Sequence, residues 1–187
     1  LGLVPEGKEQ LVADKLREVV AGNNYFLDFG LLGSKTVPAM LTKYGYIEDA
    51  MKMITKTEAP SWGYWVETMG YSTLPETWTL SPKFADASLN HVFMGDVSAW
   101  MMNQLAGINH DDSDPGFRHI RITPHFVKEL DWAKGEYYSV RGLISSQWKR
   151  EGGKVTLTVT IPSGCTADIR VGDKTETVGS GTYVNTY

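Results

Sequence analysis

The spacing of apolar residues changes from a helical to a strand-like period near residue 115, and this change limits the fold more than any other feature of the chain. Before it, Val37, Met40, Leu41 and Tyr44 recur at the period of one helix face. After it, the stretch KVTLTVTIP alternates apolar and polar residues, as a half-buried strand does. Helices followed by strands, without alternation of the two, predict an α+β fold.

The apolar pattern predicts helices over 9–21, across 37–44, across 47–54 and over 86–107, the last being the longest. Gly45 is placed to end the second helix, and the short YGY link predicts that the second and third helices form an antiparallel hairpin. The residues expected on buried faces are Val12, Leu16, Val19 and Val20 in the first helix and Leu89, Val92, Phe93, Val97, Trp100, Met101 and Leu105 in the last.

Short runs of strand character fill the chain after the acidic stretch NHDDSDPG. Gly152 and Gly153 separate two of these runs, and a Gly-Gly pair at such a place is typical of a tight hairpin with positive φ. We therefore expect a helical domain over 1–114 and a β domain over 115–187. The chain opens LGLVPEGKEQ, with neither an initiator Met nor a leader pattern, which indicates a fragment or a processed product.

Composition argues against several classes of function. The net charge of −4, without clustered Lys and Arg, argues against a nucleic-acid-binding protein. No apolar run reaches the roughly 18 to 20 residues that span a bilayer. The single cysteine, Cys165, excludes an internal disulfide and a Cys-based metal site, and we expect a half-buried structural thiol there. Gly30 and Gly33 lack the context of a phosphate-binding loop, and the four histidines show no paired helical spacing, so neither a cofactor nor a metal is expected.

One carboxylate, Glu76, stands in the polar stretch GYSTLPETW among many aromatic residues. Glycoside hydrolysis requires two carboxyl groups on opposite sides of a sugar, and aromatic faces stack on the apolar side of its ring. Pro75 biases Leu74 toward an extended conformation, so Glu76 is expected in a loop, where functional groups are often held. From the residues alone, a surface turn and the floor of a sugar-binding cleft both remain open.

Longer segments of the chain carry a resemblance to a known family. These are FLDFGLLGSKTVPAMLTKYGYIEDAMKMI, APSWGYWVETMGYSTLPETW, SLNHVFMGDVSAWMMNQLAGI and the strand-rich ITPHFVKELDWAKGEYYSVRGLISSQWKREGGKVTLTVTIPSGCTADIRV. Together they resemble the C-terminal part of the bacterial α-L-rhamnosidases, glycoside hydrolase family 78, over residues 24–171. The resemblance implies the C-terminal portion of an (α/α)6 catalytic barrel followed by an antiparallel β-sandwich.

The resemblance also implies roles for four side chains. The glutamate of the family's SWGY and G-x-[ST]-T-[LI]-x-E-x-W segment is the general base, which assigns that role to Glu76. The histidine of its S-[FL]-N-H segment contacts the sugar, which makes His91 a substrate ligand, and Trp62 and Trp78 are expected in the pocket wall. Relatives often carry an aromatic residue where Pro75 stands, and the link from Glu76 to His91 is shorter here than in many of them.

The implied reaction is an inverting hydrolysis in which Glu76 deprotonates the attacking water. The general acid is expected upstream of this chain, so the fragment alone is expected to be inactive. The expected partners are a rhamnose-containing glycan or glycoside and the remainder of its own barrel, and helix faces such as Val92, Phe93 and Trp100 are expected to favour self-association. The substrate class implies a periplasmic or extracellular location.

Two other functions fit the same residues. A hydrolase with this barrel that acts on another sugar would share the features described above. A non-catalytic carbohydrate-binding module would instead use Tyr137, Tyr138 and Trp148 of the β region as an aromatic platform, although we expect these three in the core and at the edge of the sandwich. Loss of sugar binding on substitution of Tyr137 or Trp148, with Glu76→Gln silent, would favour the module.

Overall fold

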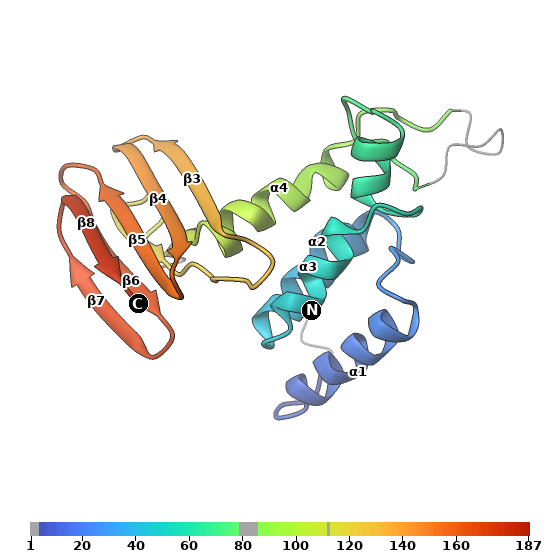
Figure 1. Cartoon of the computed structure of the whole chain (residues 1–187), viewed down its shortest axis with the longest axis horizontal. Helices are drawn as coiled ribbons and strands as arrows, with labels where there is room; N and C mark the ends of the chain where they lie inside the picture. The colour runs from blue at the N-terminus through green and yellow to red at the C-terminus, as the bar shows by residue number, and fades with distance from the viewer. Residues whose placement is uncertain (1–3, 79–85, 112) are drawn as a thin grey trace. The chain divides into compact units, whose positions relative to one another are not determined.

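The computed structural model describes residues 4–78, 86–111 and 113–187 and divides the chain into two compact units, Leu1–Ser98 and Ala99–Tyr187. The first unit is built of helices and loops, and the second mainly of strands (Figure 1). The predicted α+β class is confirmed. The short helix α4 (Asp96–Trp100) crosses the division between the units, and the domain boundary expected after residue 114 stays a prediction.

Three helices open the helical unit, as the apolar spacing predicted. They are α1 (Glu9–Gly22), α2 (Leu31–Lys43) and α3 (Ile47–Thr55). The α2 and α3 helices pack on each other as the predicted hairpin, and Gly45 follows α2 with a φ of 88°, the left-handed conformation expected of it. The buried face of α1 is narrower than predicted, because Val20 is buried but Val12 and Val19 are 47% and 58% exposed.

A buried carboxylate ties α1 to α3. Asp49 on α3 accepts hydrogen bonds from Arg17 Nε on α1 at 2.7 Å and from the Tyr25 hydroxyl at 3.0 Å. Lys52 Nζ lies 3.6 Å from the same carboxylate. Burial by itself would raise the pKa of Asp49, but the hydrogen bonds from Arg17 and Tyr25 and the charge of Arg17 outweigh it, so this pKa lies below its ordinary value.

The long helix predicted over 86–107 is wrong at its start. Helical turns begin at Val92 and run through η3 (Val92–Gly95), α4 and η4 (Met101–Leu105), whereas 86–91 are not helical. Part of this segment pairs with the loop around Glu76 instead. The Glu76 N–H donates to Ser88 O and the His91 N–H donates to Leu74 O, each at 2.8 Å. Backbone groups engaged in that pairing are not available to a helix.

The buried face of the same segment also differs from the prediction. The buried apolar residues in the described part of this segment are Met94, Val97, Trp100, Leu105 and Ala106. Those predicted to be buried but found exposed are Leu89, Val92, Phe93 and Met101. Leu89 lies in the paired loop rather than on a helix. In the single turn of η3, Met94 is the residue that points inward, and the two residues before it, Val92 and Phe93, are exposed.

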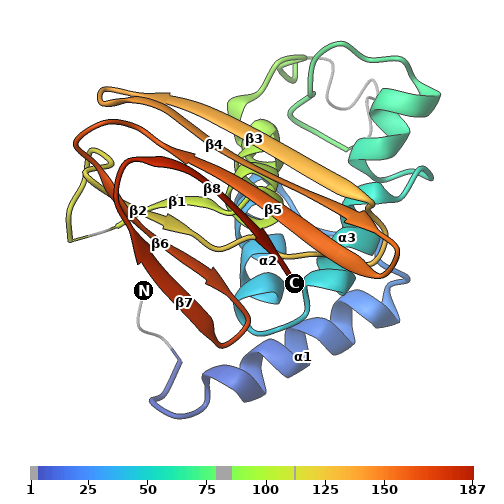
Figure 2. The same ribbon diagram turned by 60° about the vertical axis from the view of Figure 1, so that its left-hand side comes forward.

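The described residues of the β unit form two four-stranded sheets. One has the order β1 (Ile108–His110), β2 (His119–Ile122), β6 (Thr166–Val171), β7 (Lys174–Val178), and the other β3 (Trp132–Ser139), β4 (Gly142–Glu151), β5 (Lys154–Ile161), β8 (Gly181–Thr186). The sheets form two layers (Figure 2) that share one hydrophobic core, to which Ile120 and Ile169 contribute from one sheet and Ile144 and Leu157 from the other. Cys165, predicted to be half-buried, is buried in this core.

The strand pairing follows the prediction with one exception. Among the strands that the structure describes, all pairs are antiparallel except β2 with β6, which is parallel. The exception arises because the chain leaves β2, forms β3 to β5 in the other sheet and returns as β6. The hairpin at Gly152 and Gly153 is confirmed, with φ of 55° and 78°. Within the described part of the chain, no helix combines the length and the hydropathy that crossing a membrane requires.

Candidate active site

The SWGY segment is fixed by contacts specific to its residue types. Ser61 is buried, and its Oγ accepts the Tyr64 N–H at 2.9 Å at the start of η1 (Tyr64–Thr68). A Cβ at Gly63 would lie 2.3 Å from the Lys56 carbonyl oxygen, so glycine is required there. Trp62 is buried, and its Nε1 donates to the carbonyl oxygen of residue 94 at 3.0 Å, which joins the segment to η3.

Trp78 lies at the centre of an aromatic cluster. Its ring stacks on Trp65 with 4.6 Å between centroids, and it meets Trp62 and Phe29 edge-on at 5.2 and 6.1 Å. The Trp78 Nε1 donates to Phe29 O at 2.5 Å. These contacts anchor the end of the GYSTLPETW stretch, and so the adjacent Glu76, against the loop that leads into α2.

Glu76 is held through both its backbone and its side chain. Its N–H donates to Ser88 O at 2.8 Å, and its Oε2 accepts the Ser88 N–H at 3.0 Å. Pro75 is buried and Glu76 is half-buried, in the loop conformation that the proline predicted. The carboxylate therefore has a fixed position on a loop, rather than the mobility of a glutamate in a surface turn.

Glu76 and Trp78 line one cavity of about 700 Å³ in the helical unit. The other lining residues are Gly30, Leu31, Leu32, Gly33, Thr77 and Met94. Among these described lining residues, Glu76 carries the only ionisable side chain. A concave, mostly apolar site with a small number of placed polar groups is the usual form of a small-molecule site.

The other two predicted ligands support this cavity without lining it, as far as the described residues show. Trp62 contacts Trp78. The His91 N–H donates to Leu74 O at 2.8 Å, and His91 Nδ1 accepts the Phe93 N–H at 3.4 Å. Since Nδ1 is the acceptor, the neutral ring carries its proton on Nε2, where it can donate to a ligand.

The remaining carboxylates near the aromatic segment have other surroundings. Glu58 pairs with Lys56 at 3.3 Å, and Glu67 and Asp28 are exposed. Across residues 4–78, 86–111 and 113–187, no three His, Cys, Asp or Glu side chains are grouped so as to hold a metal ion. A carboxylate such as that of Glu76 can accept or donate a proton.

Two family models match the chain. That of the bacterial alpha-L-rhamnosidase 6 hairpin glycosidase domain matches residues 1–105, more than half of the chain, and that of the bacterial alpha-L-rhamnosidase C-terminal domain matches residues 107–184. The chain belongs to the bacterial alpha-L-rhamnosidase family. The family resemblance predicted from the motifs is thus confirmed.

Curated relatives named alpha-L-rhamnosidase agree with this membership. One from Streptomyces avermitilis is 29% identical over 90% of this chain and 17% of its own length. One from Formosa agariphila is 27% identical over 90% of this chain and 18% of its own length. The chain therefore spans less than a fifth of these two proteins.

Solved structures of alpha-L-rhamnosidases share the fold. The crystal structure of the S. avermitilis alpha-L-rhamnosidase complexed with L-rhamnose superposes with a TM-score of 0.89 at 27% identity, covering 99% of this chain and 20% of that chain. The alpha-L-rhamnosidase from Dictyoglumus thermophilum gives a TM-score of 0.85 at 28% identity, covering 97% and 23%.

For this member of the rhamnosidase family, sequence reasoning missed part of the cavity wall. Leu31, Leu32 and Met94 line the cavity, but their spacing in the sequence gives no signal for a site. Gly30 and Gly33, considered only as parts of a phosphate loop, lie in the same wall. The Ser34 Oγ donates to the carbonyl oxygen of residue 93 at 3.0 Å and so joins the two segments that form the wall.

Proposed function

We propose that this chain supplies the base-bearing part of the active site of an alpha-L-rhamnosidase, with Glu76 as the general base. The observation that carries the proposal is the cavity in which Glu76, the only ionisable group among the described lining residues, lies beside Trp78. The names of the family models and relatives support the substrate class. In this proposal the helical unit is the C-terminal portion of an (α/α)6 barrel, and the β unit is its β-sandwich.

The reaction is an inverting hydrolysis. Glu76 accepts a proton from a water that attacks the anomeric carbon, while an acid on the opposite side of the sugar protonates the leaving oxygen. The Ser88 N–H, at 3.0 Å from Oε2, restrains the carboxylate, so its other oxygen is oriented without further ordering when the sugar binds. The groups proposed to contact the sugar are the indole of Trp78, which lines the cavity, and His91 Nε2–H, which is outside the described lining.

The general acid is proposed to lie outside this chain. Glu76 is the only carboxylate among the described cavity-lining residues, and the chain covers 17% and 18% of the first two curated relatives. Inverting pairs stand about 6.5 to 9.5 Å apart, a separation that admits one water. The acid is therefore expected at that distance from Glu76, with the sugar between the two groups.

The test is hydrolysis of an aryl α-L-rhamnoside by the natural polypeptide that contains this chain. Glu76→Gln is expected to lower kcat by about 10²- to 10⁴-fold, because the amide cannot accept the proton. The amide oxygen can still accept the Ser88 N–H, so the unfolding midpoint should stay close to that of the parent. Glu67→Gln is the matched control, since Glu67 is exposed on η1 and outside the cavity lining.

An active Glu76→Gln protein would assign the base to another residue. A parent without activity on rhamnosides would favour the alternative, a hydrolase of the same barrel that acts on another sugar, and a panel of aryl glycosides would identify that sugar. For an active parent, NMR of the first product separates the mechanisms: inversion releases β-L-rhamnose first, and retention releases the α-anomer.

A further inference from the structure

The outer face of the sheet β3-β4-β5-β8 carries a second hollow, of about 430 Å³, which lies wholly within the β unit. Its lining includes Trp132, Lys134, Gln147, Lys149, Thr156 and Thr158. We propose that this hollow binds a neutral sugar unit of a polysaccharide, with the Trp132 indole as the stacking surface. The choice of polysaccharide as the polymer rests on the function proposed above, whereas the sugar site itself is argued from the β unit alone.

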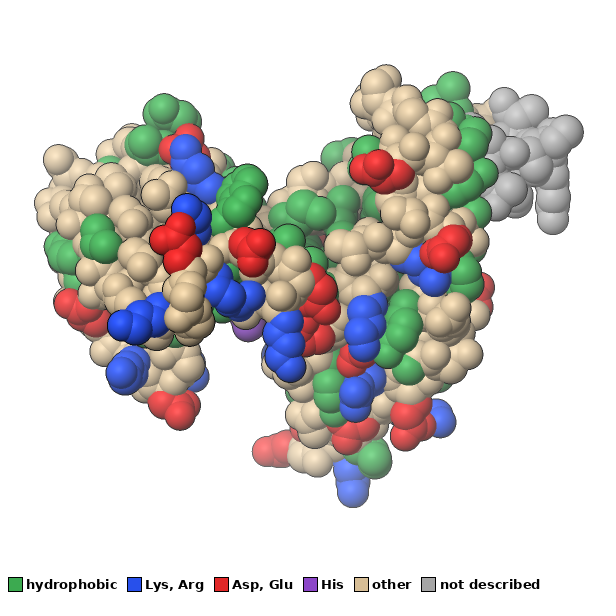
Figure 3. Space-filling view, in the orientation of Figure 1, with side chains coloured by type: hydrophobic (Ala, Val, Ile, Leu, Met, Phe, Trp, Pro, Cys, Tyr) green, Lys and Arg blue, Asp and Glu red, His purple; other side chains and the backbone are tan. Residues whose placement is uncertain are grey.

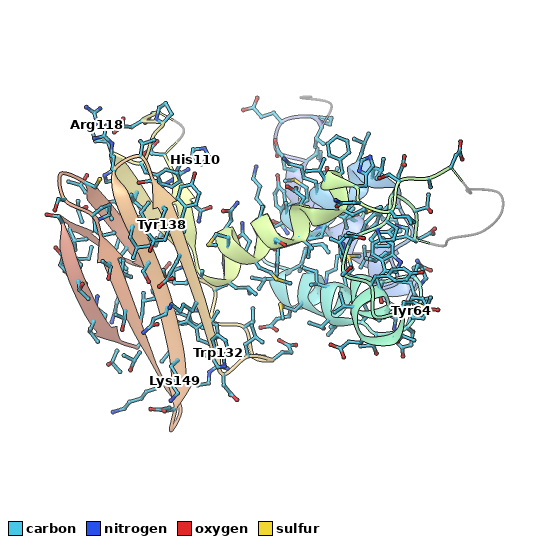
Figure 4. All side chains as sticks on the ribbon, turned by 90° about the horizontal axis from the view of Figure 1, so that it is seen from above. Tyr64, His110, Arg118, Trp132, Tyr138 and Lys149 are labelled. Atoms are coloured by element: carbon cyan, nitrogen blue, oxygen red, sulfur yellow. The ribbon has the colours of Figure 1, made fainter. Side chains whose placement is uncertain are left out.

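Trp132 is placed as a platform and not as a core residue. It is 64% exposed at the first position of β3, directly opposite Lys149 on β4, and Figure 4 shows both at the same end of the sheet. Trp148, by contrast, is 1% exposed, and its Nε1 donates to Leu105 O at 2.8 Å. In the hypothesis of a carbohydrate-binding module, Trp148 forms part of the aromatic platform. Its burial rules that out, and Trp132, which that hypothesis does not include, is the exposed tryptophan on this face.

Polar groups on the neighbouring strands face the same hollow. The alternation along β4 and β5 turns Gln147 and Lys149 outward, and the register sets them opposite Thr158 and Thr156. Within the described residues, neither the Trp132 indole N–H nor the Gln147 amide has a hydrogen-bond partner in the protein. A pyranose ring combines an apolar face with hydroxyl groups, and this site offers a flat aromatic face beside donors and acceptors.

The charges on this face are compensated locally. Lys149 Nζ lies 2.5 Å from Glu151, and Lys134 Nζ lies 2.9 Å from Glu136. Figure 3 likewise shows side chains of both signs intermixed on the β unit. Because each lysine already has a carboxylate partner, the hollow favours a neutral ligand over an anion such as a phosphate or a uronate.

The start of β3 is held rigidly, which lowers the ordering cost of binding at Trp132. The Arg150 guanidinium donates to Phe126 O at 3.0 Å, Val127 O at 3.1 Å and Leu130 O at 2.9 Å. The Arg150 N–H also donates to Asp131 O at 2.7 Å, immediately before the tryptophan. One side chain thus fixes the loop that positions the platform.

The test is native affinity electrophoresis of the natural polypeptide that contains this chain. The gels contain arabinogalactan, xyloglucan or mixed-linkage β-glucan. The protein carries Glu76→Gln so that no polymer is consumed. At least one of these polymers is expected to retard it, and Trp132→Ala should weaken that binding about tenfold, which corresponds to about 1.4 kcal/mol. Trp132→Tyr should keep most of the retardation, because a tyrosine ring also stacks.

Val184→Ala is the matched control. Val184 is 63% exposed on the same face, opposite Thr158 and outside the lining of the hollow, so its truncation should leave retardation unchanged. Unfolding midpoints show whether each variant is folded. The proposal is overturned if no polymer retards the protein, or if Trp132→Ala and Val184→Ala behave alike.

This test separates the two proposals. In the natural polypeptide that contains this chain, with Glu76 intact, Trp132→Ala should hydrolyse a small aryl α-L-rhamnoside at the parental rate. Trp132-dependent retardation in a protein without rhamnosidase activity would uphold the saccharide site and refute the proposed function. Rhamnosidase activity combined with retardation that does not depend on Trp132 would uphold the proposed function and refute the saccharide site.

Discussion

Glu76 and Ser88 are joined by two hydrogen bonds: the Glu76 N–H donates to Ser88 O at 2.8 Å, and the Ser88 N–H donates to Glu76 Oε2 at 3.0 Å. The Thr73 Oγ1 adds a bond to Leu89 O at 2.7 Å. Two loop segments of the chain thus behave as a short paired ribbon. The position of the proposed base depends on this ribbon rather than on a helix or a sheet.

The hydrogen bond from the Ser88 N–H to the Glu76 side chain predicts that two substitutions of Glu76 will differ in stability. Glu76→Ala removes the acceptor of the Ser88 N–H and should lower the free energy of unfolding by about 0.5 to 1.5 kcal/mol. Glu76→Gln retains an acceptor oxygen and should change it far less. Urea unfolding of both variants checks this, and equal losses would show that the side-chain bond contributes nothing.

The network around Asp49 predicts an acid-sensitive helical unit. The pKa of Asp49 is lower in the folded chain than in the unfolded chain, so the unfolded chain binds more protons as the pH falls. The stabilisation is therefore complete above the unfolded pKa of about 4 and is lost as the pH drops through the folded pKa. Urea unfolding from neutral pH downwards should show this loss.

Asp49→Asn is the variant that isolates this carboxylate. It should lower stability at neutral pH by about 1 to 3 kcal/mol, because the partly buried hydrogen bonds of Arg17 and Tyr25 lose a charged acceptor. It should also reduce the fall in the free energy of unfolding that accompanies acidification. Asp28→Asn, at an exposed position, should do neither. A parental pH profile in Asp49→Asn would contradict the assignment.

Gly63 and Gly22 predict opposite responses to the same added methyl group. At Gly63 a Cβ would lie 2.3 Å from the Lys56 carbonyl oxygen, so Gly63→Ala should cost about 1 to 3 kcal/mol and disturb the SWGY segment. At Gly22, the last residue of α1, nothing lies within 4 Å, so Gly22→Ala should be neutral or stabilise by up to about 1 kcal/mol. Thermal unfolding compares the two, and a harmless Gly63→Ala would show that the loop relaxes freely.

Sequence reasoning succeeded where the structure is set by the local spacing of apolar residues. The α2–α3 hairpin and strand β5 follow from apolar spacing and from glycines at their ends, and both are found within a few residues of their predicted positions. It failed at 86–91, where the apolar pattern indicates a helix but the backbone pairs with Leu74 and Glu76. That pairing joins distant segments, and no local pattern records it.

The candidate site shows the same limit. The stretch around Glu76 predicted a loop but did not decide between a surface turn and a sugar cleft, and the family resemblance was needed to assign a role. The cavity itself is assembled from three separate segments, around Leu31, Glu76 and Met94. Trp132 was missed for a similar reason, because only the register of β3 against β4 reveals that it faces outward beside Lys149.

The most direct test of Glu76 as the base is chemical rescue. In the natural polypeptide that contains this chain, Glu76→Ala should lose hydrolysis of an aryl α-L-rhamnoside. Sodium azide should restore aryl release, because the anion fills the space of the carboxylate and its water and needs no base. Azide then forms the new bond at the anomeric carbon as the protonated aryl oxygen leaves, and the expected product is β-L-rhamnosyl azide. Glu67→Ala should stay active and insensitive to azide. Full hydrolytic activity in Glu76→Ala, or an α-configured azide, would contradict the assignment of Glu76 as the base of an inverting enzyme.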